Sequence, residues 1–338
     1  MSIKFITAIF LLIITGCATP AKHDLKRPRS QRDCRNVKII RKHAIAACGN
    51  LLIIENLLTR KRKEYSEIDS KLIEADDIAI AGNFLFTISM NDHLKMYDIL
   101  NPSEPVFIDD KEDVPVQLYT GIDAYNGLVV TSGGLKGSYI ARYTTKGFKQ
   151  KLDLVSSVEG YFGRPDVLIW KSHKMREPRL IHSVDVSLTY KWGINISEYG
   201  KDKYYTRRLL PLQSGLGPVT LAAYQPANFP ITALQVNNYL YYSHWKSKSI
   251  YKVNLNNKKL NEELVYQSEF IVSHMASDGK NIFIVNLDTR NLVYKLNLKN
   301  NKLTSLKSKL IQLPIGIAAK QGYIAIADKL NGLVILKY

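Results

Sequence analysis

The amino-acid sequence predicts an all-β fold, a β-propeller in which four-stranded sheets are arranged as a ring. Three observations support this prediction. A unit of short strands and tight turns recurs along the 338 residues, one stretch contains a complete four-stranded unit, and both chain ends carry incomplete pieces of it. Because four short strands cannot bury both of their faces alone, such a unit needs neighbours on each side.

The complete unit lies at Asp77–Ile108. Its apolar stretches predict four strands, and the Gly82-Asn83 dipeptide between the first two is typical of hairpin turns, which need positive φ angles. A second turn is expected at Asn91-Asp92. The predicted strands are Asp77–Ala81, Phe84–Ser89, Leu94–Ile99 and a fourth that begins at Val106.

The same pattern of strand, turn and strand returns five times, beginning at His43, Gly121, Ile231, Ser273 and Gly316. The wide interval between the turns at Asn126 and Asn238 indicates a further unit within Ser157–Ala223, with Asp166–Trp170 as its second strand. One unit in this interval gives seven blades, which is the prediction; six or eight blades are the alternatives.

The chain ends predict how the ring closes. The last unit has three strands, Gly316–Ala319, Tyr323–Asp328 and Gly332–Leu336, and an additional strand, Val37–Lys42, precedes the first unit. Propellers avoid long exposed strand edges. We therefore expect residues 37–338 to form the propeller domain, closed by pairing of strand 37–42 with the C-terminal blade.

The N-terminus predicts export from the cytoplasm. The apolar run Phe5–Ile14 follows Lys4 and is too short to span a bilayer, which needs about 20 residues, so residues 1–16 are expected to be a signal peptide. Ile14-Thr15-Gly16-Cys17 resembles the bacterial lipobox. This resemblance implies cleavage before Cys17 and acylation of its thiol and its new amine, and several acyl chains anchor a protein stably. An ordinary secretory signal with a coincidental cysteine is the alternative.

Residues 17–36 are expected to form a lipidated and basic flexible tether. Nine basic residues lie between Lys22 and Lys42, against the two acids Asp24 and Asp33. Such a segment suits anionic lipid head groups, and a solvated spacer is the alternative. Under lipoprotein sorting rules, Ala18 after the cysteine implies the outer membrane of a cell that has two membranes.

Two further cysteines, Cys34 and Cys48, form an even pair in an oxidising compartment. A disulfide between them would tie the tether to the first repeat. The alternative is buried free thiols, which pack as small apolar residues.

The net charge of +17 favours anionic partners. Because the chain is expected outside the cytoplasm, nucleic acid is not expected among them. Arg60, Lys61, Arg62 and Lys63 form a compact basic stretch, and seven Lys or Arg residues without an acid lie between Thr289 and Ala327. We expect the four residues to contact the membrane or an acidic partner. A basic surface of no specific use is the alternative.

Motifs of catalysis and metal binding are lacking. The seven histidines form no His-x-His or His-x-x-x-His pair, and the chain has no CxxC pair, GxSxG elbow or phosphate-binding loop. No catalytic residue, cofactor or metal ligand is therefore predicted. The acidic pairs Asp76-Asp77 and Asp109-Asp110 are expected at strand junctions; calcium binding in a central channel is the less favoured interpretation.

One stretch resembles a known repeat class. Tyr97-Asp98-Ile99 and the loop Asn101–Pro105 are similar to the LVIVD-repeat class of bacterial β-propellers, and Asn331–Leu336 is similar to its third strand. The expected function is that of a membrane-anchored lipoprotein of the bacterial cell envelope, a non-catalytic platform that binds a protein partner or an anionic envelope component. The alternative is an envelope hydrolase or lyase with a metal or a His/Asp cluster in the central channel.

Overall fold

The computed structural model describes residues 33–89, 93–111, 121–132, 138–154, 167–170, 179–185, 192–200, 203–211, 231–244, 248–256, 262–286, 290–320 and 322–338. They belong to one compact unit, Arg32–Tyr338. All regular elements in the described ranges are β-strands, which form six four-stranded antiparallel sheets, a three-stranded sheet and a two-stranded hairpin.

The first three four-stranded sheets follow one another along the chain. The first contains β1 (Asn36–Ile40), β2 (His43–Ala47), β3 (Leu52–Asn56) and β4 (Arg62–Tyr65). The hairpin β5 (Glu67–Ile68) and β6 (Lys71–Leu72) leads to the second, with β7 (Asp77–Ala81), β8 (Phe84–Ile88), β9 (Leu94–Asp98) and β10 (Val106–Lys111). The third contains β11 (Ile122–Tyr125), β12 (Leu128–Ser132), β13 (Ser138–Thr144) and β14 (Gly147–Leu154).

Four more sheets complete the chain. The fourth contains β15 (Val167–Trp170), β16 (Arg179–Asp185), β17 (Trp192–Gly200) and β18 (Lys203–Pro211), and the fifth β19 (Ile231–Val236), β20 (Tyr239–His244), β21 (Ser249–Asn254) and β22 (Glu262–Gln267). The sixth contains β23 (His274–Ser277), β24 (Asn281–Val285), β25 (Leu292–Asn297) and β26 (Leu303–Lys307). The last has three strands, β27 (Pro314–Lys320), β28 (Tyr323–Asp328) and β29 (Gly332–Lys337).

The local sequence explains the hairpins. Between β11 and β12, Asn126 and Gly127 both have positive φ angles, 49° and 80°, as a tight turn between twisted strands requires. The strands predicted in Asp77–Ile108 are confirmed to within one residue at their ends. In the fourth sheet, Val167–Trp170 is the first strand of its sheet and not the second, so that part of the prediction was wrong.

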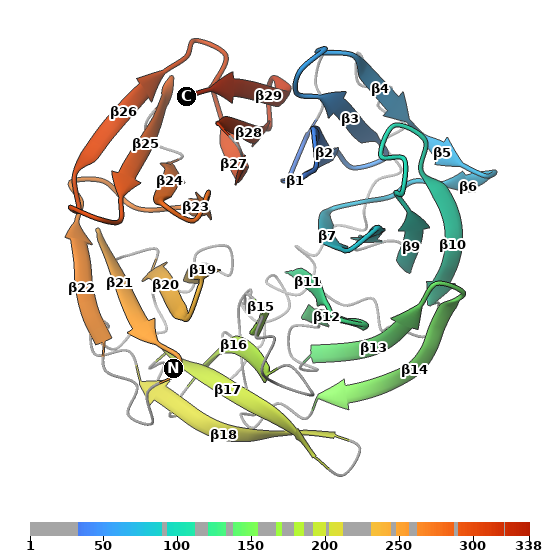
Figure 1. Cartoon of the computed structure of the whole chain (residues 1–338), viewed down its shortest axis with the longest axis horizontal. Helices are drawn as coiled ribbons and strands as arrows, with labels where there is room; N and C mark the ends of the chain where they lie inside the picture. Colours follow the sequence, from blue (N-terminus) through green and yellow to red (C-terminus); the bar gives the residue numbers. More distant parts are fainter. Residues whose placement is uncertain are drawn as a thin grey trace, which may run out of the picture. The chain divides into compact units, whose positions relative to one another are not determined.

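Neighbouring sheets pack face to face through apolar side chains, and this packing forms the core. Figure 1 shows the sheets of this unit following one another around a centre. One core cluster joins the first and second sheets through buried residues such as Ile45 and Leu85, and similar clusters join the second to the third, the fifth to the sixth and the sixth to the last. In each of these pairs, a sheet buries a face that it could not bury alone.

The first and last sheets also share a core cluster, in which Val37 and Ala46 pack with Ala325 and Leu333. We call this contact the seam. The predicted pairing of strand 37–42 with the C-terminal blade was wrong, because β1 pairs with β2 in the register Ile40 to His43. A two-residue turn costs far less chain entropy than pairing with a strand almost three hundred residues away. At the seam the two sheets therefore meet through side chains.

Gly316 in β27 lies close to the backbone of the first sheet at the seam. A Cβ atom at this position would lie 2.8 Å from the carbonyl oxygen of Arg35 and 3.1 Å from Cα of Asn36. We expect Gly316→Ala to lower the free energy of unfolding by about 2 kcal/mol, since backbone atoms cannot yield as a flexible side chain does. Urea unfolding measures this. Gly49→Ala is the control, because a Cβ atom at this position would meet nothing within 4 Å. This substitution should cost only the strain of alanine at a positive φ, about 1 kcal/mol. An equal loss in both variants would contradict the close contact.

Candidate functional site

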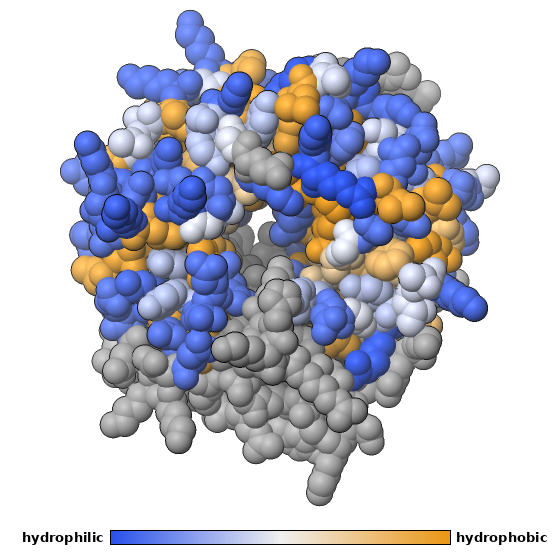
Figure 2. All heavy atoms as spheres, in the orientation of Figure 1, coloured by the Kyte–Doolittle hydropathy of each residue, from blue (hydrophilic) through white to orange (hydrophobic). Residues whose placement is uncertain are grey.

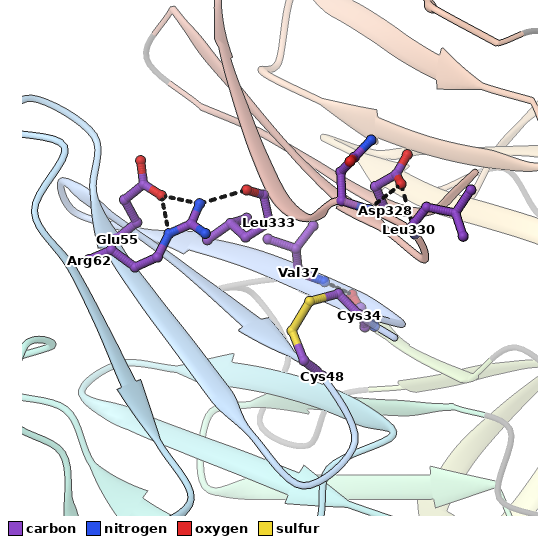
Figure 3. The surroundings of a disulfide bond; sticks show 10 residues. Cys34, Val37, Cys48, Glu55, Arg62, Asp328, Leu330 and Leu333 are labelled. Atoms are coloured by element: carbon purple, nitrogen blue, oxygen red, sulfur yellow. Dashed lines mark hydrogen bonds and ion pairs between the residues drawn. A yellow bond between two sulfur atoms is a disulfide. The ribbon is translucent and has the colours of Figure 1, made fainter. Parts of the chain in front are cut away.

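A disulfide bond fixes the start of the propeller. Cys34 and Cys48 are bonded to each other and lie 14 positions apart in the sequence. Both cysteines are buried and belong to the core cluster of the seam. The bond connects the segment before β1 to the turn after β2, beside Val37 (Figure 3). Of the two alternatives for these cysteines, the structure has the disulfide.

A buried carboxylate organises the predicted basic stretch. Glu55 in β3 is only 2% exposed. Its carboxylate forms two ion pairs, one between Oε1 and Arg60 at 2.9 Å and one between Oε2 and Arg62 at 2.7 Å. Arg62 also donates to the carbonyl oxygen of Leu333 in β29 at 2.8 Å and so bridges the seam (Figure 3). Glu55 was not singled out from the sequence, since a single acid in an apolar strand gives no signal of its partners.

The other two residues of the basic stretch point elsewhere. Lys63 lies 3.5 Å from Glu104 and donates to the carbonyl oxygen of Ser103 at 3.2 Å, in the loop between β9 and β10. Lys61 is exposed in the turn between β3 and β4. The structure therefore divides the four residues: Arg60 and Arg62 neutralise Glu55, Lys63 contacts the second sheet, and Lys61 faces solvent.

Asp77 connects the innermost strands of three successive sheets. Its Oδ1 accepts hydrogen bonds from the side-chain amide of Asn36 and from the backbone N–H of Ile78 at 2.7 Å. Its Oδ2 accepts from the backbone N–H of Ile122 at 3.2 Å. Burial raises the pKa of the Asp77 carboxyl, and the nearby charge of Lys38 and these hydrogen bonds oppose that shift in part. The arrangement indicates that Asp77 holds the inner strands together.

A cavity of about 530 Å³ lies at the centre of the sheets. It is lined by residues of β1, β7, β11, β19, β23 and β27, the innermost strands, and Figure 2 shows an opening at the centre of the molecule. This volume is in the usual range for small-ligand sites. Its charged lining residues are Lys38, Lys320 and Asp123, of which Asp123 is buried and the two lysines are half-buried and exposed respectively.

The strand order places alternate loops at opposite ends of the sheets. The turns between first and second strands and those between third and fourth strands lie at one end, which we call the turn face. Arg41 shows that these turns meet, since it donates to Asn83 Oδ1 between β7 and β8 and to the carbonyl oxygen of Leu100 between β9 and β10. Each sheet begins with its innermost strand running towards this face, so the chain enters β1 from the opposite end.

The turn face is basic. In the described parts of its turns, Lys and Arg outnumber Asp and Glu by eight to two, whereas the described loops at the opposite end hold five of each. Composition alone could not show this, because it depends on which loops share an end. The eight are Arg41, Lys42, Arg60, Lys61, Lys146, Lys280, Lys299 and Lys302, and the two acids are Glu104 and Asp278.

Both acids of the turn face are engaged. Asp278 accepts hydrogen bonds from the Tyr338 hydroxyl at 2.7 Å, from the backbone N–H groups of Lys280 and Asn281, and from the Asn281 side chain. Burial on its own would raise the pKa of Asp278, but these hydrogen bonds lower it below its ordinary value. Glu104 accepts from Asn101 at 3.0 Å and lies near Lys63. Neither acid neutralises the exposed lysines of this face.

The remaining predicted features are partly outside the described residues. Cys17, the signal peptide 1–16 and the tether up to residue 32 lie outside them. In the part of the chain that the structure describes, no group of three or more His, Cys, Asp or Glu side chains is arranged to hold a metal ion. His43 interacts with Asn56 at 3.2 Å and Ser103 at 3.0 Å. The described residues also contain no helix of the length and apolarity needed to cross a membrane.

Sequence comparison identifies one repeat family. The model of the LVIVD repeat matches residues 74–110 and 315–336, which are the second sheet and most of the last one. These are the two regions in which the sequence resembles that class. A search of curated protein sequences finds no match.

Solved structures support the fold. The chain is similar to hydrazine synthase of Kuenenia stuttgartiensis, with a TM-score of 0.69 and 11% identity over 95% of this chain and 98% of that one. It is also similar to the β-propeller domain of Cps50 (Swd1) from Myceliophteria thermophila, with a TM-score of 0.64 and 12% identity over 92% and 98% of the two chains. A chain of the mitotic checkpoint complex gives a TM-score of 0.61 and 10% identity, with 90% of each chain covered.

At these identities the likeness concerns the fold alone. Together with the LVIVD repeats and the four-stranded sheets, it establishes that this all-β chain is a β-propeller.

Proposed function

We propose that the protein is a lipoprotein of the bacterial cell envelope, anchored through Cys17, whose propeller serves as a non-catalytic binding platform. The observation that carries this proposal is the Cys34–Cys48 disulfide, which closely follows the lipobox-like segment. Disulfides persist in oxidising compartments outside the cytoplasm. The sequence signal for export and the covalent chemistry of the folded domain thus favour the same location, and Ala18 favours the outer membrane.

We further infer that the six four-stranded sheets and the three-stranded sheet are seven blades, with the ring closed by side-chain packing at the seam. Support comes from the apolar cluster that the first and last sheets share and from Arg62, which reaches across to Leu333. A rigid ring presents many turns at one end, which is suited to binding a partner.

Replacement of Cys17 tests the anchor. Cells expressing the chain are supplied with radiolabelled palmitate, and the membrane and soluble fractions are separated. We expect label in the unaltered protein, no label in Cys17→Ser, and accumulation of uncleaved Cys17→Ser precursor, because the thiol is the site of acylation. The variant Cys34→Ala/Cys48→Ala keeps Cys17 and should remain labelled. Label on Cys17→Ser, or none on the unaltered protein, would contradict lipidation at this residue.

A further inference from the structure

The central cavity reaches the turn face. The cavity is lined by Gly82, in the turn after β7, and by Lys320, the last residue of β27, which both lie at that face. Lys38 of β1 lines the cavity deeper inside. Exposed Lys280 and Lys299 lie in turns of the neighbouring sixth sheet, on the same face. Lysines therefore line the wall of the cavity, and further lysines lie on the same face of the propeller.

The exposed charged side chains in this region are lysines. Asp123 is the acid in the cavity lining and is buried, and Lys38 also lies near the carboxylate of Asp77, so the exposed positive charge comes from Lys320 and Lys280. Asp278 at the surface is engaged by Tyr338 and by neighbouring N–H groups, as described above. An approaching anion would meet lysine side chains that no described carboxylate on this face neutralises, and a concave site between low-dielectric walls strengthens such attraction.

We propose that the turn face binds an acidic polypeptide segment, with one of its carboxylates in the central cavity near Lys38 and Lys320 and its other acids on the surrounding lysines. This deepens the proposed role as a binding platform and rests on it. The cavity, at about 530 Å³, is large enough for an acidic side chain or a carboxyl terminus.

The geometry favours a polypeptide over a bilayer. Lys38 is half-buried within a concave cavity, where a flat membrane surface cannot reach it, whereas an extended acidic segment can insert a side chain. The chain also enters β1 from the end opposite to the turn face. The described residues before β1, 33–35, therefore lie at the end opposite to the turn face.

The test uses the purified full chain in neutral detergent and a fluorescent peptide of alternating Glu and Ser residues. Binding is measured by anisotropy at low and at physiological salt. We expect saturable binding that weakens as salt increases, because exposed charges are screened. Lys38→Gln/Lys320→Gln should weaken binding roughly tenfold, and Lys320→Gln alone, at an exposed position that folding does not need, should weaken it by about threefold.

The matched control is Lys307→Gln/Lys309→Gln, which removes the same charge from exposed positions at the opposite end. It should change the affinity by less than about twofold. Absence of binding to the acidic peptide, or an equal loss from the two double variants, would overturn the proposal. Binding of phosphatidylglycerol vesicles without binding of the peptide would also overturn it, in favour of a membrane surface. None of these results bears on palmitate labelling of Cys17, so a failure here is distinct from a failure of the anchor.

Discussion

Replacing Arg62 by Met should lower the free energy of unfolding by roughly 2 to 3 kcal/mol. Glu55 is almost fully buried and forms ion pairs with both Arg62 and Arg60. Methionine keeps much of the packing of the arginine stem, but it leaves Glu55 with one cation and leaves the carbonyl oxygen of Leu333 without its side-chain donor. A buried charge that loses a partner is costly, which is why the expected effect exceeds that of a surface ion pair.

Arg60→Met is the matched control for Arg62. It also removes a cation from Glu55, but Arg60 is about half exposed and its ion pair with Glu55 lies within the first sheet. Its expected cost is below about 1 kcal/mol. Urea unfolding followed by intrinsic fluorescence compares the two variants at the same pH. Equal costs would show that the contact across the seam contributes nothing beyond the neutralisation of Glu55.

Removing the Cys34–Cys48 disulfide should cost about 3 kcal/mol, the value expected for a closed loop of this length. The bond limits the freedom of the unfolded chain, and in the folded protein it fixes the segment before β1 against the turn after β2. The measurement is urea unfolding of the unaltered protein and of Cys34→Ala/Cys48→Ala, each with and without a reducing agent.

The reducing agent separates the role of the bond from that of the two side chains. It should lower the unfolding midpoint of the unaltered protein and leave that of the double alanine variant unchanged. Both cysteines are buried, so alanine at these positions adds a small packing cost that the reducing agent does not produce. An unaltered protein whose unfolding is insensitive to complete reduction would show that the bond contributes no stability.

Much of the fold could be predicted from local sequence. The second sheet was predictable because Gly82-Asn83 gives a tight turn between alternating apolar strands, and such hairpins depend on residues close in the chain. The three-stranded last sheet was predictable for the same reason. The fourth sheet was harder, since the sequences between β15 and β16 and between β16 and β17 contain no turn dipeptide, and Val167–Trp170 was assigned to the wrong position in the sheet.

Contacts between distant segments could not be predicted in this way. The closure of the ring was assigned to strand pairing because β1 precedes the first complete unit, yet the Arg41-Lys42 turn pairs it locally with β2. In the sequence, residues 60–63 look like an unpaired basic patch. The neighbouring sequence does not reveal that Glu55 is buried and forms ion pairs with Arg60 and Arg62. The basic turn face and the cavity combine residues from many sheets, and only the strand order brings them to one end.

The most direct test of the central claim, that the first and last sheets of the propeller are held together at the seam, is hydrogen exchange of the Arg62→Met variant. Mass spectrometry follows peptides from β1–β3, from β27–β29 and from β20–β21 as a remote reference. We predict faster exchange in β1–β3 and β27–β29 together, with little change in β20–β21, because Arg62 bridges the first sheet to Leu333. Faster exchange in the first sheet alone, with β27–β29 unchanged, would contradict this claim.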